Sequence, residues 1–282
     1  MPAKLLPLKH QASTAPSGDQ RMNSHLLDAL SVEALFVLTF LLMVLGLELG
    51  FQSGQRAKGK WVEEQAAQVR ALMAATLGLL AFMLAFTFSV AQNHFESRIQ
   101  LQIDEANLAR DAFMQADLYS EPMRTQARQL LLEHVEGRVT LNEKVREKRG
   151  DQVLQLLNRA NEIHLQLWAL GIEGRGSETQ GMTQSVLGLM GMQTRRVQAA
   201  LANRIPLIIW LTLYFTAAVA MIVVGHQAGL ARSRSPVATY SLALAFSAVM
   251  SLISDLDRPF QNLFEVDVTV MRELAEFMRA SV

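Results

Sequence analysis

The residues best suited to chemistry in this chain gather where its last long apolar segment ends, at Asp255, Asp257 and Arg258. Two carboxylates and a guanidinium at this spacing can pair with one another, cap a neighbouring helix or bind an ion. Pro259 follows directly and restricts Arg258 to extended backbone, so we expect the helix to end there. The group is therefore either a salt bridge that fixes the turn or the charged mouth of an ion pathway.

A weakly polar stripe leads along the same segment toward these charges. Steps of three and four residues put one set of side chains on a single helix face, namely Tyr240, Leu244, Ser247, Ser251, Ser254 and Arg258. Such a stripe either lines a pore or marks an interface where small side chains let helices approach closely. The pore interpretation makes these residues candidates for an ion pathway: Ser247, Ser251, Asp255 and Arg258.

Two aromatic residues, Phe82 and Phe86, stand out in the second apolar segment. They lie one helical turn apart on the same face, and the polar residues Thr87, Ser89 and Gln92 follow them. Packing between helices is one explanation of the pair. In a ring of subunits, the same pair would form a hydrophobic constriction that gates by dewetting.

The first apolar segment carries Glu33 near its start and Glu48 near its end. Each position lies within about a turn of a membrane interface, where a carboxylate can reach water. Solvation at the helix ends explains both residues. A functional acid at a pore mouth is the alternative, and it adds Glu33 to the candidate pathway.

Recognisable catalytic and metal-binding patterns are missing. The sequence has no P-loop, no HExxH pair, no nucleophile elbow and no cysteine. We expect His134 and His164, on helices among charged neighbours, to be solvated. The same is expected of a charged helix face formed by Arg124, Arg128, Glu133, Glu136 and Arg138. We therefore predict no catalytic residue, no metal site and no cofactor, and an enzyme is disfavoured.

Four apolar segments must hold the candidate residues in place: Leu30–Leu49, Ala71–Ala91, Leu207–Gly225 and Val237–Ser254. About 20 residues of helix cross a hydrocarbon layer of about 30 Å. A soluble helix needs only one apolar face, whereas these segments are apolar all round. We therefore predict four transmembrane helices. The first is a retained span and not a signal peptide, because no small-residue cleavage site follows it.

The stretch between the second and third spans, residues 92–206, is charged and amphipathic. Ser120 and Pro122 signal the start of a helix, and Gly171 with the glycines that follow ends a later one. No segment alternates polar and apolar residues at period two, so we expect no sheet. We predict an all-α protein in which two plus two transmembrane helices flank a soluble antiparallel helical layer.

The two ends of the chain differ in character. Residues 1–29 contain several prolines and serines and predict a mobile tail, with Met22 as an alternative start. Residues 255–282 predict an amphipathic segment that docks on the helical layer. Its apolar positions are Leu263, Val266, Val270, Leu274 and Phe277.

Charge indicates topology and partners. Four spans place both termini and the helical layer on one side of the membrane and two short loops on the other. The short loops are the richer in basic residues, which favours a cytoplasmic location for them in a bacterial inner membrane. These residues are Arg56, Lys58, Lys60, Arg70, Arg232 and Arg234. The formal net charge of zero disfavours nucleic acid as a partner.

Several ordered motifs resemble the bestrophin-like bacterial membrane proteins, a domain family of unknown function. They are the run Leu80–Ser89, then Phe95–Arg98, Glu105–Asn107, Ala116–Leu118, Glu121-Pro122 and the closing Ser251–Pro259. The resemblance covers residues 30–282, and the long N-terminal tail departs from it. The family is distantly similar to the bestrophins, which are ring-shaped anion channels with four spans per subunit and a helical soluble part. That similarity implies a channel-like plan. No match to the bestrophin pore or calcium-binding residues is found, so no residue role is carried over.

Two functions fit these observations. The first is a homo-oligomeric ion channel or channel-like pore, whose partners are the lipid bilayer, copies of itself and small ions. The second is a membrane-anchored sensor or scaffold whose helical layer binds a ligand or another protein. A membrane enzyme is a third and less favoured class. It stays open because an enzyme need not carry any of the known catalytic motifs.

Overall fold

A computed structural model describes residues 30–57, 63–147, 150–173, 180–201, 204–231, 236–258 and 269–282. The predicted N-terminal tail with Met22, and the apolar positions Leu263 and Val266, lie outside these ranges. The described residues form helices and no strand, which confirms the all-α class. The chain divides into two compact units. The first comprises Met1–Thr87 and Ile205–Leu252, and the second comprises Phe88–Arg204 and Ile253–Val282.

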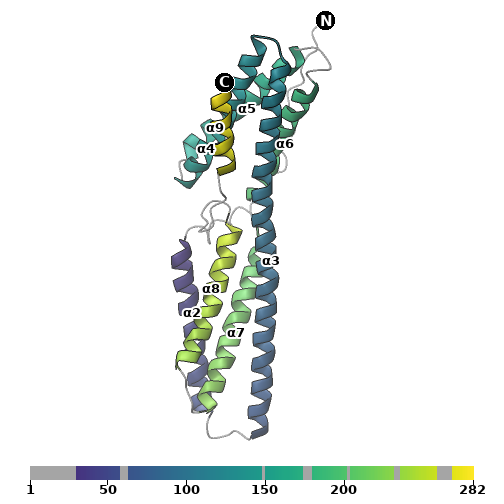
Figure 1. Cartoon of the computed structure of the whole chain (residues 1–282). Coiled ribbons are helices and arrows are strands. Elements are labelled where there is room, and N and C mark those ends of the chain that lie inside the picture. The colour runs from purple at the N-terminus through teal and green to yellow at the C-terminus, as the bar shows by residue number, and fades with distance from the viewer. Residues whose placement is uncertain are drawn as a thin grey trace. The chain divides into compact units, whose positions relative to one another are not determined.

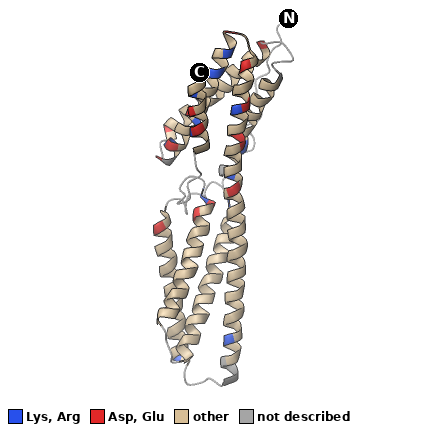
Figure 2. Cartoon of the chain, viewed as in Figure 1, with Lys and Arg blue, Asp and Glu red and all other residues tan. Residues whose placement is uncertain are grey.

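Four helices with residues in the first unit are long and apolar enough to cross a membrane, as predicted. They are α2 (Val32–Arg56), α3 (Glu63–Gln115), α7 (Leu207–Ala231) and α8 (Pro236–Asp257), drawn in Figure 1. Figure 2 shows that their middle stretches are almost free of charged residues. Both α3 and α8 continue into the second unit. α3 runs on past its apolar segment because the residues after Ala91 keep a helical pattern.

Glycines hold α2 and α7 at backbone contact. They recur every four residues, at Gly46, Gly50 and Gly54 on α2 and at Gly225 and Gly229 on α7. A Cβ atom on Gly50 would overlap the carbonyl oxygen of Ile222, and one on Gly225 would overlap that of Leu47. Helices in lipid gain nothing from burying apolar surface and associate through such close packing. Shape therefore fixes this pair.

Hydrogen bonds between side chains also join helices of the first unit. The hydroxyl of Tyr240 on α8 donates to Glu48 Oε1 on α2 at 2.9 Å. Ser53 Oγ lies 2.8 Å from Nδ1 of His226 on α7. The Glu48 carboxylate therefore has a hydrogen-bond partner on a neighbouring helix. Solvation at the helix end, the explanation offered from the sequence, does not include this partner.

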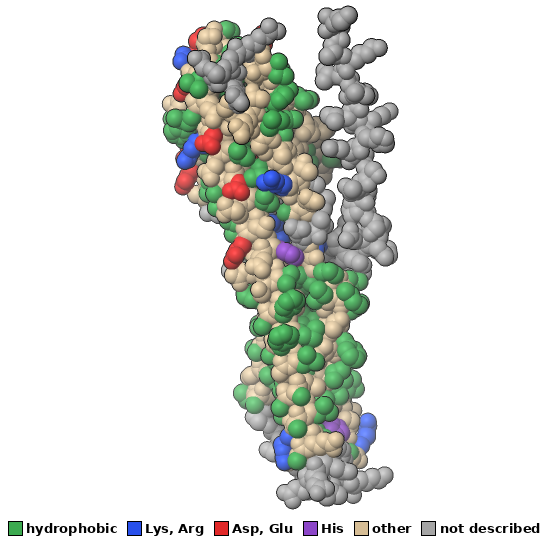
Figure 3. All heavy atoms as spheres, turned by 90° about the vertical axis from the view of Figure 1, so that its right-hand side faces the viewer, with side chains coloured by type: hydrophobic (Ala, Val, Ile, Leu, Met, Phe, Trp, Pro, Cys, Tyr) green, Lys and Arg blue, Asp and Glu red, His purple; other side chains and the backbone are tan. Residues whose placement is uncertain are grey.

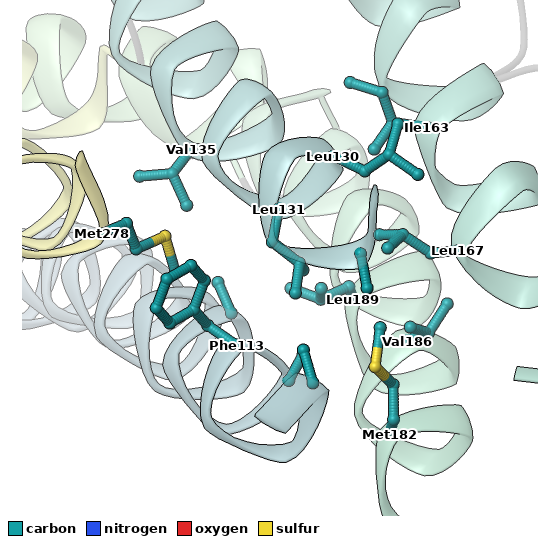
Figure 4. Packing of buried hydrophobic residues seen from close by; sticks show 14 of the residues in the cluster. Phe113, Leu130, Leu131, Val135, Ile163, Leu167, Met182, Val186, Leu189 and Met278 are labelled. Atoms are coloured by element: carbon teal, nitrogen blue, oxygen red, sulfur yellow. The ribbon is translucent and has the colours of Figure 1, made fainter. Parts of the chain in front are cut away.

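The second unit contains the end of α3 and a set of shorter elements. These are η1 (Ala116–Leu118), α4 (Met123–Arg146), α5 (Gly150–Glu173), α6 (Gln180–Leu201) and α9 (Thr269–Ser281). One apolar core joins them, and Figure 4 shows members from each helix: Phe113 from α3, Leu131 from α4, Leu167 from α5, Val186 from α6 and Met278 from α9. The helical layer therefore has a hydrophobic core of its own.

The C-terminal helix α9 is amphipathic, as predicted, and packs on α4. Its buried face consists of Met271, Leu274, Ala275 and Met278. The ring of Phe277 meets that of Phe113 edge to face, with centroids 6.2 Å apart. Arg128 of α4 donates to the carbonyl of Ser281 at 2.8 Å. These contacts tie the end of the chain to the core.

Candidate functional site

The charged group at the end of α8 is buried. The helix ends at Asp257, as Pro259 predicts, and the backbone N–H of Arg258 donates to the Asp255 carbonyl at 3.1 Å. Only 1% of Asp255, 7% of Asp257 and 3% of Arg258 is exposed. Charges withdrawn from water are costly unless they are paired. This end of α8 is therefore organised around electrostatic partners.

α3 supplies two partners that sequence-based prediction missed. A guanidinium nitrogen of Arg98 donates to the carbonyl of Leu256, and His94 Nδ1 lies 3.8 Å from Asp257 Oδ1. The Arg98 guanidinium also lies 5.9 Å from the ring centroid of Phe95. An arginine at the last carbonyls of a helix caps it and opposes the negative end of its dipole. Capping is thus the structural role of Arg98.

Arg98 keeps donors for a further partner. Its Nε and one terminal nitrogen are buried and have no hydrogen-bond partner among the described residues. The opposite charge of Asp257 and the like charge of Arg204 both act on it. Spare guanidinium donors suit an anion, a phosphate group or ordered water. The predicted salt bridge within the last turn of α8 stays a prediction. The structure brings two side chains of α3, His94 and Arg98, to that turn.

The serines of the predicted polar stripe are covered by the chain itself. Ser247 is fully buried and donates to the Ala243 carbonyl at 2.7 Å. Ser251 is 7% exposed, and its hydroxyl has no hydrogen-bond partner in the described part of the chain. Leu244, earlier on the same stripe, is 48% exposed. The serine part of the stripe therefore faces the interior of the single chain.

The other predicted pathway residues are exposed. Phe82 and Phe86 on α3 expose 70% and 60% of their surface, and Figure 3 shows hydrophobic side chains gathered on the face of the first unit that carries α3. Glu33 is exposed in the first turn of α2, where Ser31 caps the helix by accepting from the N–H of Ala34 at 3.2 Å. A carboxylate there complements the positive end of the helix dipole.

A second buried polar group lies inside the second unit. Glu105 of α3 accepts hydrogen bonds from Arg138 Nε of α4 at 3.1 Å and from a terminal nitrogen of Arg196 of α6. His134 Nε2 of α4 lies 3.6 Å from Glu105 Oε1, and the ring centroids of His134 and His164 are 4.9 Å apart. Since His164 belongs to α5, four helices meet here. We call these five residues the Glu105 cluster.

The expectation that His134, His164 and Arg138 face water was wrong. They are buried, with 3%, 2% and 6% of their surface exposed. His134 and Arg138 follow Leu131 at helical steps on the inward face of α4, and Glu105 supplies a partner from a distant part of the chain. Their register with that apolar stripe is the signal that could have revealed the cluster.

Most ring nitrogens of the two histidines in the Glu105 cluster lack a hydrogen-bond partner among the described residues. Neither ring nitrogen of His134, and not Nε2 of His164, has a hydrogen-bond partner within the described residues. Burial lowers the pKa of His164 to about 4, and the neighbouring His134 acts in the same direction while Glu105 partly offsets both. His164 is therefore neutral at pH 7. No group of His, Asp and Glu among the described residues has the arrangement of a metal site.

A comparison with protein families matches residues 40–271 to the bestrophin-like domain. Comparisons with curated proteins and with solved structures found no match. The matched range covers most of the chain and includes the end of α8, its partners on α3 and the whole Glu105 cluster.

Proposed function

The chain belongs to the bestrophin-like family, and from this premise we propose that it forms a homo-oligomeric ion channel or channel-like pore. In this proposal the short loops lie in the cytoplasm of a bacterial cell, as their basic residues favour. The partners are the bilayer, further copies of the chain and small ions. The proposal includes no catalytic step.

One face of α3 carries the observation that supports assembly. Small side chains recur on it at steps of three and four residues, and all are exposed: Ala71, Ala74, Gly78, Ala81 and Ala85. A Cβ atom on Gly78 would meet no neighbouring atom within 4 Å. Small residues let transmembrane helices approach closely. This face is therefore suited to contact with a helix of a second copy.

The outward face of α2 offers a contrast, because its composition suits contact with lipid. Its large exposed residues are Val37, Leu38, Leu41, Leu42, Leu45 and Leu49. Where two helices of the same chain do touch, at Gly50 and Gly225, the contact is made by small residues. α3 presents small residues of the same kind at the surface of the single chain.

Phe82 and Phe86 border this small-residue face, each directly following one of its alanines. When copies of α3 surround an axis, two aromatic rows narrow the path between them. A narrow apolar passage closes when water withdraws from it. We assign the gate to these two residues.

The buried candidates take other roles in the proposal. Ser251 lacks a hydrogen-bond partner among the described residues, and a polar group in lipid needs one, so we assign Ser251 to contact with water or ions inside the subunit. Ser247, whose hydroxyl already donates to the Ala243 carbonyl, lies beside it on the same stripe. Asp255 and Arg258 form the charged exit of α8. Glu33 is the acid at a membrane surface.

Ion flux through proteoliposomes tests the gate. Replacing both Phe82 and Phe86 by alanine widens the constriction, and we expect passive leak to rise at least about tenfold. Phe215→Ala is the matched control, because Phe215 is also 70% exposed but lies on α7. Leak that does not rise in the double variant, or that rises equally in the control, counts against the gate.

The alternative function is a membrane-anchored sensor or scaffold. The observation that favours it is the separate core of the second unit, which could support binding without a pore. This alternative predicts that the second unit retains its partner when flux is abolished. Co-purification of a specific ligand with a variant that does not conduct would support it.

A further inference from the structure

In the Glu105 cluster, a guanidinium and an imidazole lie close to the same carboxylate oxygen. Arg138 Nε lies 3.1 Å from Glu105 Oε1, and His134 Nε2 lies 3.6 Å from the same oxygen. Arg138 makes the shorter of the two contacts, and its Nε donates a hydrogen bond to Glu105. A protonated imidazole is a strong donor to a carboxylate. Protonation of His134 would therefore create a competitor for the partner of Arg138.

The charge balance of the cluster makes added protons costly. Leaving the two histidines aside, one carboxylate faces the two guanidinium groups of Arg138 and Arg196, so these three groups together carry one excess positive charge. His164 has no carboxylate of its own in contact and faces His134 at 4.9 Å between ring centroids. A buried charge without a partner is strongly destabilising. Each added proton therefore increases a repulsion that the surrounding helices must contain.

Other charged groups on the packed helices do not relieve this repulsion. On α5, Arg159 pairs with Glu133 of α4 on the exposed side of both helices. On α9, which packs on α4, Arg272, Glu273 and Glu276 are exposed, and Arg279 pairs with Glu136. On α3 and α6, Arg110, Asp111 and Arg195 are exposed. Among the described residues, the two imidazoles therefore lie beside Glu105 and each other.

We propose that the Glu105 cluster is an acid-sensitive switch, in which protonation of His134 and His164 draws Glu105 from Arg138 and loosens the packing of α3, α4, α5 and α6. This inference concerns the second unit and does not depend on the proposed channel. Its parts lie in four helices, so loosening one contact affects the whole helical layer.

The direction of the pH dependence follows from His164. Its pKa is about 4 in the folded protein, below the ordinary value of about 6.5 that applies when the helices open. The open state therefore takes up the proton first, and the native state loses stability as the pH falls from about 6.5 toward about 4. Over that interval, opening becomes up to about 300-fold more favourable, since each pH unit is worth a factor of ten.

Hydrogen exchange of the full-length protein in lipid nanodiscs tests the switch. Exchange is measured at pH values of about 7 and about 4.5 and corrected for the intrinsic pH dependence of amide exchange. We expect protection in α4 and α5 to fall at least about tenfold at the lower pH, while α2 and α7 keep theirs. Unchanged protection in α4 and α5 of the wild-type protein overturns the proposal, whatever the variants do.

Variants then locate the sensor. His134→Gln and His164→Gln keep a polar side chain but cannot take up a proton near these pH values. His164→Gln should abolish most of the loss of protection, and His134→Gln should reduce it, because His134 adds to the lowering of the His164 pKa. His226→Gln on α7 removes a histidine from the first unit and should leave the loss in α4 and α5 intact. An acid response that is equal in the wild type and both cluster variants assigns the switch elsewhere and overturns the proposal.

Discussion

The two units of this protein hold their helices together by different means. In the first, α2 and α7 meet backbone to backbone at glycines, and a hydrogen bond between Ser53 and His226 adds to this contact. In the second, an apolar core surrounds Glu105, two arginines and two histidines. The difference follows from solvent: lipid offers no hydrophobic driving force between helices, whereas water does. The first unit should therefore be most sensitive to changes of volume at the glycine contact, and the second to changes of charge or pH in the Glu105 cluster.

Among the changes that test this difference between the units, removal of the Glu105 carboxylate should have the largest effect on stability. Glu105→Gln leaves Arg138 and Arg196 buried without a compensating charge, so we expect the second unit to lose about 3–5 kcal/mol of stability. Chemical unfolding of the purified protein, followed by a probe in α4, measures the loss.

Glu133→Gln is the matched control for the carboxylate. Glu133 pairs with Arg159 at 2.6 Å, but both side chains are almost half exposed, so the cost should stay below about 1 kcal/mol. Equal costs at Glu105 and Glu133 would show that burial of the Glu105 cluster contributes no special stability.

A single methyl group tests the first unit. Gly50→Ala places a Cβ atom onto the backbone of α7, and we expect a loss of about 1–3 kcal/mol as the helices separate. Thermal unfolding in detergent measures it. Gly137→Ala makes the same substitution on α4, where no atom lies within 4 Å of the new Cβ, and it should stabilise by up to about 1 kcal/mol. A gain at Gly50 would contradict the backbone contact.

The cap on α8 should give the smallest effect. Arg98→Gln removes a charged donor to the Leu256 carbonyl, and we expect a loss of about 1–2 kcal/mol. The free energy of unfolding of the second unit is the quantity to compare. Arg110→Gln, an exposed position on the same helix, is the control and should change stability by less than about 0.5 kcal/mol. If Arg98→Gln left the free energy of unfolding unchanged, the capping role of Arg98 would be contradicted.

Features set by local pattern could be predicted from the sequence. The four spans follow from hydropathy alone, and the end of α8 follows from Pro259, because each depends on neighbouring residues. The glycine contact between α2 and α7 was not predicted, because the partner of Gly46, Gly50 and Gly54 is a helix distant in the chain. A sequence pattern can show that a helix has a face of small residues, but it does not show which helix packs against that face.

Features set by distant partners could not be predicted. The register of His134 and Arg138 with Leu131 indicates that they share its inward face, but it does not identify Glu105 as the carboxylate that lies beside them. Likewise, the prediction at the end of α8 included Asp255 and Asp257 but omitted Arg98, whose contact with Leu256 crosses most of the chain. Burial of a charged residue depends on the partner that compensates it, and a single sequence does not reveal that partner.

The native mass of the detergent-purified protein tests the central claim most directly. The account predicts a closed oligomer of about four to six copies, and it predicts that Ala81→Leu on the small-residue face of α3 breaks this oligomer into smaller species. A wild-type protein that is monomeric or dimeric would contradict a pore formed by assembly, and the sensor or scaffold function would then be favoured.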